Sequence, residues 1–121
     1  MAIQESGEMY LETILILSEK KENIRAIDVG QYMGFSKPSV SRALGLLRTD
    51  AYITTDPNGY IKLTKSGLEI AEKIYERHRV LTKMLMSIGV EEKNAVADAC
   101  KMEHDISDET FEAIKKHLNM F

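Results

Sequence analysis

The sequence predicts a mostly α-helical chain whose helices are interrupted once by a short β-hairpin. Apolar residues recur every three or four positions along most of the 121 residues, which is the spacing of amphipathic helices. Two short β-prone runs flank Asp56-Pro57-Asn58-Gly59, where Pro followed by Asn-Gly favours a tight turn. The expected helices span about residues 5–21, 25–33, 36–49, 64–87, 91–103 and 107–117.

Composition limits the class of protein. A hydrophobic content of 44% with 29% charged residues is ordinary for a globular chain, and 121 residues suit one domain or two small sub-domains. No apolar run approaches the roughly 18–20 residues that span a bilayer, and the N-terminus lacks a signal-peptide pattern. The single cysteine, Cys100, excludes an internal disulfide, so we expect a cytoplasmic protein with no membrane partner.

Residues 25–49 carry the signals of a helix-turn-helix. Gly34 follows the first of the two expected helices, where a left-handed C-terminal residue is favoured. Ser36 can cap the second helix, and Pro38 falls in its first turn, where proline is tolerated. Because the hairpin follows directly, the sequence predicts a winged helix-turn-helix.

Positive charge gathers in this same segment. The net charge of the chain is −3, but residues 24–65 contain six basic and three acidic residues, which is compatible with binding phosphate groups. Serine hydroxyls and an arginine near the start of the second helix suit phosphate oxygens and base edges. A helical hairpin with a solvated polar face would give the same pattern. The candidate DNA-binding residues are Arg25, Ser36, Lys37, Pro38, Ser39, Ser41, Arg42 and Lys62.

Three potential metal ligands share one expected helical face. Cys100, Glu103 and His104 stand at positions i, i+3 and i+4, so a thiolate, a carboxylate and an imidazole would project to one side. This mixture suits a divalent first-row transition metal better than calcium or magnesium. A buried cysteine and a histidine near a helix C-terminus would explain the residues without a metal. Further candidate ligands, which core packing or a surface position would also explain, are Met9, Glu12 and His78.

The chain resembles the diphtheria-toxin-repressor family of metal-dependent transcriptional repressors over essentially its whole length. The matching segments are EMYLETI (8–14), SVS (39–41), LTKSG (63–67), RHR (77–79), ACKMEH (99–104) and ISD (106–108). The resemblance implies a winged-helix DNA-binding domain at residues 1–65 and a helical metal-binding and dimerisation domain at residues 66–121. It also implies a short form without the C-terminal SH3-like domain of the longer iron-type members.

The resemblance further implies a ligand set that draws on both domains. Residues that match the regulatory-site ligands of iron-type members are Met9, Cys100, Glu103 and His104. His78 matches a ligand of the neighbouring site in both branches of the family, and Glu12 matches a carboxylate that manganese-type members use. Thr82 and Val96 stand where iron-type members have a further acid and a further histidine, so the second site is incomplete or rebuilt around His78 and Glu12.

We therefore expect a metal(II)-activated repressor that binds a palindromic DNA operator as a homodimer and takes no small-molecule substrate. The soft pair Met9 and Cys100 favours Fe²⁺, while Glu12, Glu103 and His104 leave Mn²⁺ open. Ni²⁺, Co²⁺ and Zn²⁺ are expected to substitute in vitro. Two other classes are possible alternatives: a small metalloenzyme, for which the sequence offers no candidate nucleophile or oxyanion loop, and a constitutive DNA-binding protein with Cys100 as a thiol sensor.

Overall fold

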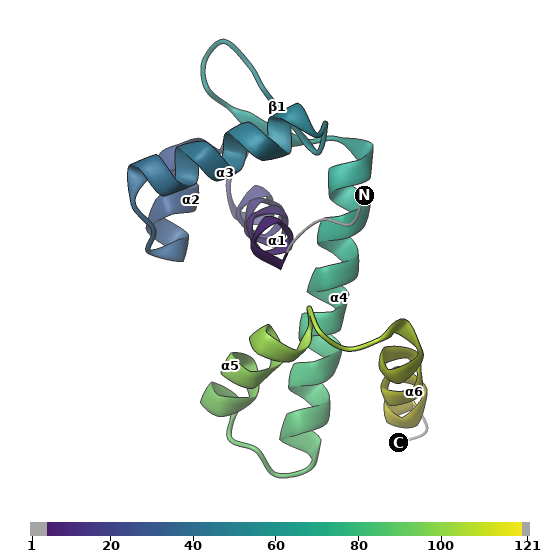
Figure 1. The fold of residues 1–121 in the computed structure, drawn as a ribbon. Coiled ribbons are helices and arrows are strands. Elements are labelled where there is room, and N and C mark those ends of the chain that lie inside the picture. The colour runs from purple at the N-terminus through teal and green to yellow at the C-terminus, as the bar shows by residue number, and fades with distance from the viewer. Residues whose placement is uncertain (1–4, 120–121) are drawn as a thin grey trace. The chain divides into compact units, whose positions relative to one another are not determined.

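The computed structural model describes residues 5–119, and its elements follow the expected order (Figure 1). The helices are α1 (Glu5–Lys20), α2 (Ala26–Met33), α3 (Lys37–Thr49), α4 (Lys65–Ser87), α5 (Glu92–Met102) and α6 (Asp108–Asn119). Strands β1 (Ile53–Thr55) and β2 (Ile61–Leu63) lie between α3 and α4. The mostly helical fold with a winged helix-turn-helix is confirmed. The chain divides into two compact units inside α4, between Glu72 and Lys73.

The first unit packs around α1. This helix contacts α2, α3 and β2, so its broad apolar stripe is buried on several sides. Leu11 and Ile14 have no exposed surface, and burying a side chain of this size contributes roughly 1.5–3 kcal/mol. The buried members of this core are Tyr10, Leu11, Ile14, Ile24, Val29, Val40, Leu44, Leu47, Ile53, Ile61 and Ala71.

Short local signals fix the turn between α2 and α3. Gly34 adopts the left-handed conformation (φ 73°) that ends α2, and its N–H donates to the carbonyl of Gly30 at 2.8 Å. Ser36 caps α3, because its hydroxyl oxygen accepts the N–H of Ser39 at 3.4 Å. Both caps were expected from the sequence, and together they set where the second helix of the motif begins.

The hairpin is an antiparallel pair whose turn is held by an aspartate. A carboxylate oxygen of Asp56 accepts the N–H groups of Asn58 and Tyr60, each at 2.9 Å. The N–H of Ile61 donates to the carbonyl of Ile24 at 2.7 Å, so the segment before α2 is bonded to β2. The hairpin is thereby tied to the helix-turn-helix as well as to itself.

Helix α4 begins and ends at residues that the sequence marks. The hydroxyl of Thr64 accepts the N–H of Gly67 at 3.2 Å, and Gly89, with φ of 102°, follows the last turn. The helix has 23 residues, but charged side chains occur along it. Within residues 5–119, no helix combines the length and apolar character needed to cross a membrane.

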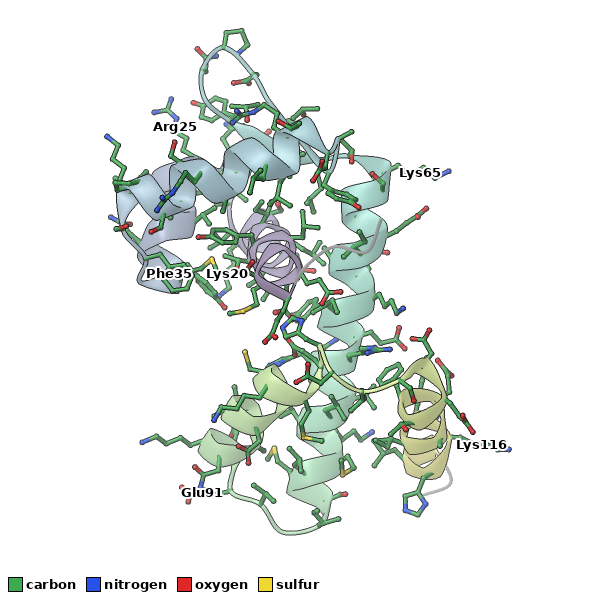
Figure 2. All side chains as sticks on the ribbon, in the orientation of Figure 1. Lys20, Arg25, Phe35, Lys65, Glu91 and Lys116 are labelled. Atoms are coloured by element: carbon green, nitrogen blue, oxygen red, sulfur yellow. The ribbon has the colours of Figure 1, made fainter. Side chains whose placement is uncertain are left out.

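The second unit consists of the rest of α4 with α5 and α6, which flank it in the view of Figure 1. Ser107 caps α6, because its hydroxyl oxygen accepts the N–H of Thr110 at 3.1 Å. Polar side chains such as Lys116 occupy the outer face of α6 (Figure 2). The buried apolar residues of this unit are Ile74, Leu81, Ala95, Ala99 and Phe111.

Gly67 permits a close approach between α4 and the start of the hairpin. The N–H of Thr64 donates to the carbonyl of Tyr52 at 3.0 Å, which brings the first turn of α4 against that carbonyl. A Cβ atom at Gly67 would overlap the carbonyl oxygen and carbon of Tyr52. Both sides of this contact are backbone, so neither can move without disturbing its hydrogen bonds.

We expect Gly67→Ala to lower the free energy of unfolding by about 1–3 kcal/mol, the usual range for overpacking. Gly45→Ala is the matched control, because Gly45 is also helical and nothing lies within 4 Å of a Cβ there. The control should raise stability by about 0.5–1 kcal/mol through helix propensity. Urea unfolding followed by circular dichroism measures both, and equal stability of the two variants would contradict the close contact.

Candidate DNA interface and metal centre

Most of the residues predicted to bind DNA lie on the exposed part of the helix-turn-helix and hairpin. Ser36 and Ser39 at the start of α3 bond to each other, since the Ser36 hydroxyl donates to Ser39 Oγ at 2.9 Å. Their clearest role in the structure is therefore to shape the first turn of α3. Of the predicted residues, Ser39 is half-buried, and those that are exposed are Arg25, Ser36, Lys37, Pro38, Ser41, Arg42 and Lys62.

Arg25 is held against the hairpin. Its guanidinium carbon lies 4.7 Å from the ring centroid of Tyr60, and an Nη2 hydrogen bond of 3.3 Å reaches the Tyr60 hydroxyl. Its backbone N–H donates to Asp28 at 2.9 Å, and this bond, more than the nearby Lys21 ammonium, holds the pKa of the Asp28 carboxyl below its ordinary value. Arg25 thus joins α2 to the hairpin while its side chain stays at the surface.

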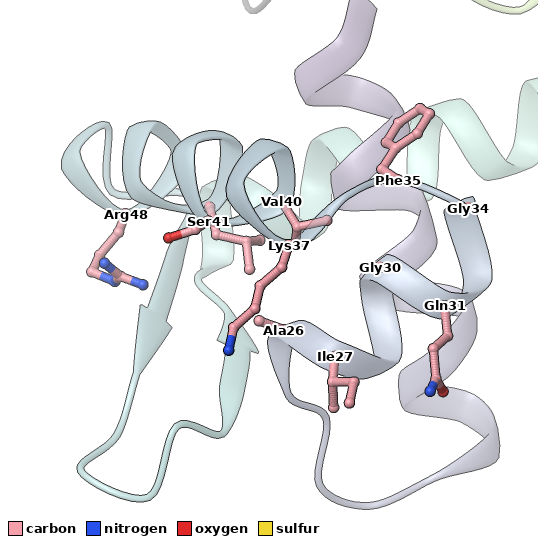
Figure 3. Close-up of a pocket in the computed structure, with 11 residues that line it drawn as sticks. Ala26, Ile27, Gly30, Gln31, Gly34, Phe35, Lys37, Val40, Ser41 and Arg48 are labelled. Carbon is pink, nitrogen blue, oxygen red and sulfur yellow. The ribbon is translucent and has the colours of Figure 1, made fainter.

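A groove of about 570 Å³ runs between α2 and α3 (Figure 3). Its floor is apolar, and Ile27 at its edge is 65% exposed. Among the described residues that line it, Lys37 and Arg48 are cationic and none is acidic. The Nε of Arg48 donates to Thr55 Oγ1 at 3.2 Å, which fastens the last turn of α3 to β1. Arg48 is one of the six basic residues of segment 24–65, and the sequence alone indicates no role for it.

The residues predicted to bind metal divide between the two units. Met9 and Glu12 lie one turn apart on α1, where Met9 is half-buried and Glu12 is buried. Those of the second unit are His78 on α4, Cys100 near the end of α5, and Glu103 and His104 just after it. Helix α5 ends at Met102, one residue before the predicted end, so Glu103 and His104 open the turn that follows.

The second unit brings His78, Glu103 and His104 together. Nδ1 of His78 lies 2.8 Å from one carboxylate oxygen of Glu103, and Nε2 of His104 lies 3.4 Å from the other. Glu103 has no exposed surface, and the side chains of His78 and His104 are 22% and 1% exposed. Cys100 stands one turn before Glu103 and is half-buried. A surface position for His78, or an interaction of His104 with the helix dipole alone, would not explain why both imidazoles lie against the Glu103 carboxylate. A shared buried cluster accounts for this arrangement.

This cluster fits a divalent cation. A buried carboxylate costs free energy unless hydrogen bonds or charge compensate it. Oε1 of Glu103 is buried and, among the described residues, accepts no hydrogen bond. Imidazole nitrogens and a carboxylate are donors that divalent transition metals accept, and a nearby thiol would add a soft donor. The residues present thus match the kind of ion that the sequence predicted.

A charged residue beside this cluster, Arg77, was not predicted from the sequence. Its side chain is 5% exposed, and it donates hydrogen bonds to the carbonyl oxygens of Glu103 at 3.1 Å and Ile106 at 2.8 Å. The available signal was its position, because Arg77 falls in line with the buried Ile74 and Leu81 on α4. A charged residue inside an apolar stripe indicates a buried polar partner.

Both halves of the chain match models of a known family. Residues 2–61 match "Iron dependent repressor, N-terminal DNA binding domain", and residues 64–121 match "Iron dependent repressor, metal binding and dimerisation domain". The chain is 31% identical to an uncharacterised HTH-type transcriptional regulator of Methanocaldococcus jannaschii, over 98% of this chain and 97% of the relative. The chain belongs to the iron-dependent repressor family. The resemblance noted in the sequence is confirmed.

Other members of the iron-dependent repressor family are similar over most of this chain. The transcriptional regulator MntR of Escherichia coli O157:H7 is 33% identical, over 88% of this chain and 68% of its own length. The structure of the manganese regulator SloR superposes with a TM-score of 0.84 at 30% identity, over 98% of this chain. This chain spans about half of the SloR chain, 55% of its length. The family consists of metal-dependent transcriptional regulators, so this member is not an enzyme.

Asp108 makes part of the stability of this family member depend on pH. A hydrogen bond and the charge of Lys73, followed by those of Arg77, hold the pKa of the Asp108 carboxyl below its ordinary value of 3.8. A lowered pKa in the folded state stabilises the fold above the ordinary pKa, and this contribution is lost as pH falls through the lowered value.

We therefore expect Asp108→Asn to be less stable than the unsubstituted protein at pH 7. The difference should shrink once the pH is well below 3.8, where the carboxyl of the unsubstituted protein also becomes neutral. Thermal unfolding between pH 7 and pH 2 measures the difference. A gap that stays constant over this range would show that the charge of Asp108 does not contribute.

Proposed function

We propose that this protein is a metal(II)-activated repressor that binds a palindromic DNA operator as a homodimer in the cytoplasm. The observation that carries the proposal is the fully buried carboxylate of Glu103 between His78 and His104. A buried carboxylate with two imidazoles is a donor set for a divalent cation. The family's description as DNA binding, metal binding and dimerisation supports the same function.

The proposed ligands come from both units. In the second unit they are Cys100, Glu103 and His104, with His78 as a further ligand or as the support of Glu103. In the first unit they are Met9 and Glu12. The bound ion would supply positive charge to these groups. Helix α1, which carries Met9 and Glu12, contacts α3 directly, so a constraint on α1 would reach the helix proposed to read DNA.

The proposed mechanism is a restriction of motion between the units. A ligand set shared by the units would limit how the DNA-binding unit moves relative to the dimerisation unit. In a homodimer, that limit would set the spacing of the two α3 helices, which have to meet successive major grooves of the operator. Metal binding and operator binding would then strengthen each other by the same factor.

The DNA contacts that we propose are those of the exposed helix-turn-helix and hairpin residues. Arg42 on α3 is proposed to reach a phosphate or a guanine edge, and Lys37 and Lys62 are proposed to bind phosphates. The guanidinium of Arg25 is held by Tyr60 and is therefore less free to reach a base. We propose that Arg25 contacts the DNA backbone. The remaining proposed contacts are Ser36, Pro38, Ser39 and Ser41.

We propose Fe²⁺ as the activating metal, on the softness of Met9 and Cys100. One observation favours Mn²⁺ as the second candidate. The named relatives include the manganese regulator SloR, and a solved manganese-dependent repressor with manganese bound shares the fold at a TM-score of 0.86 and 23% identity. The carboxylates Glu12 and Glu103 would suit that harder ion.

The deciding experiment is a DNA-binding titration with and without metal. An operator is first selected from random duplex DNA under anaerobic conditions with Fe²⁺ present. We expect Fe²⁺ or Mn²⁺ to raise operator affinity by about 5–150-fold over the chelator-treated protein, the usual range of allosteric coupling. Scrambled duplex of equal length is the control. Equal operator affinity in the presence and absence of every divalent metal tested would overturn the proposed function.

Cys100→Ala tests the thiolate as a ligand. We expect it to weaken metal-dependent operator binding by tenfold or more while the metal-free protein keeps its thermal midpoint within a few degrees, because a half-buried cysteine contributes little packing. Cys100→Ser is the matched variant, since it keeps the size of the side chain and removes the soft sulfur. Loss of stability in proportion to the loss of metal response would indicate a packing role instead.

A further inference from the structure

Arg77 is a buried cation that the proposed function leaves unused, and both of its terminal nitrogens donate hydrogen bonds. Its Nη1 donates to the carbonyls of Glu103 at 3.1 Å and Ile106 at 2.8 Å, and its Nη2 donates to the carboxylate of Asp108. The guanidinium carbon also lies 5.4 Å from the centroid of the Phe111 ring. All these acceptors belong to the turn between α5 and α6 or to the start of α6.

The hydrogen bonds of Arg77 cap the C-terminus of α5. The last carbonyls of a helix have no partner within the helix, and a cation near them is favourable because of the helix dipole. Glu103 is the C-terminal cap residue of α5, directly after Met102, so its carbonyl is one of these groups. Arg77 therefore fixes the backbone of the turn at both Glu103 and Ile106, on either side of His104.

Arg77 is also adjacent in sequence to His78. The same turn of α4 thus presents one side chain to the backbone of Glu103 and another to its carboxylate, where His78 Nδ1 lies at 2.8 Å. The position of the Glu103 side chain relative to His78 follows from the position of its backbone relative to α4. Through its hydrogen bond to the Glu103 carbonyl, Arg77 directly determines the position of the Glu103 backbone relative to α4.

We propose that Arg77 is a positioning residue for the metal site, which holds Glu103 and His104 in place for the ion without touching it. The inference rests on the proposed function for the identity of the ligands. Lysine is a poor substitute at this position, because a single ammonium on a flexible stem cannot bond three separate acceptors in the fixed directions of a guanidinium.

The test compares Arg77→Lys and Arg77→Met with Arg79→Met. Arg79 is the matched control, because it lies two residues away on α4, is exposed, and stacks on Tyr75 at 4.7 Å. For each full-length protein, the affinities for Mn²⁺ and Co²⁺ are measured by competition with a chelating dye. The visible absorption of the Co²⁺ form reports the geometry of the ligands, and the thermal midpoint of the metal-free form reports stability.

We expect Arg77→Lys to lose about 10–100-fold in metal affinity, as for other residues that orient ligands, and to change the Co²⁺ spectrum. Arg79→Met should keep both within twofold. A variant with a lower thermal midpoint but unchanged affinity and spectrum would overturn the proposal, because Arg77 would then only stabilise the fold. If Arg77→Met does not fold, Asp108→Ala removes one acceptor of the guanidinium and is measured in its place.

Hydrogen exchange of the metal-free protein tests whether Arg77 holds the turn, independently of whether the protein binds metal. The amides of residues 103–107 should exchange at least tenfold faster in Arg77→Lys than in Arg79→Met, because the turn has lost its fixed donor. Failure of the unsubstituted protein to bind any metal would contradict the proposed function alone. Unchanged exchange of these amides in Arg77→Lys would contradict the positioning role itself.

Discussion

The second unit depends on the burial of one carboxylate. Glu103 has no exposed surface, so its charge is matched by groups inside the protein. His78 and His104 approach its two oxygens, and Arg77 bonds its backbone carbonyl. One carboxylate oxygen still lacks a hydrogen bond among the described residues, and a cation would remove that cost. The same electrostatic requirement thus accounts for the fold of the turn and for its suitability as a metal centre.

The first unit is stabilised in a different way, through its turns. Ser36, Asp56 and Thr64 each accept backbone N–H groups where a helix or a hairpin turn begins. Arg48 bonds the end of α3 to β1, and Gly67 lets α4 approach the backbone before β1. Most of these contacts join residues that are close in sequence. The exposed surface that we propose to read DNA is therefore held by contacts within the first unit.

The difference between the units explains which features the sequence could predict. Gly34 and Ser36 act on their own neighbours, so residue type and spacing were sufficient to predict both caps and the hairpin. The partners of Arg77 are 26–31 residues further along the chain, and no local pattern identifies them. The end of α5 at Met102 lies within one residue of the predicted end, but the bond from Arg77 to the Glu103 carbonyl was not predictable from local sequence. The spacing of Glu103 and His104 predicted a shared metal site, and that site stays a prediction; the burial of both side chains depends on tertiary contacts.

The choice of metal follows from donor chemistry more than from family membership. At a given site with nitrogen, oxygen and sulfur donors, Fe²⁺ binds more tightly than Mn²⁺, so a manganese response needs hard donors or a higher supply of manganese. The buried His78, Glu103 and His104 group would accept either ion. Selectivity in the proposed site would then depend on Met9 and Cys100, whose sulfur atoms favour the softer ion. Within this chain, a substitution at Met9 or Cys100 would change the proposed soft donors without removing the Glu103 carboxylate or the Arg77 side chain that bonds its backbone.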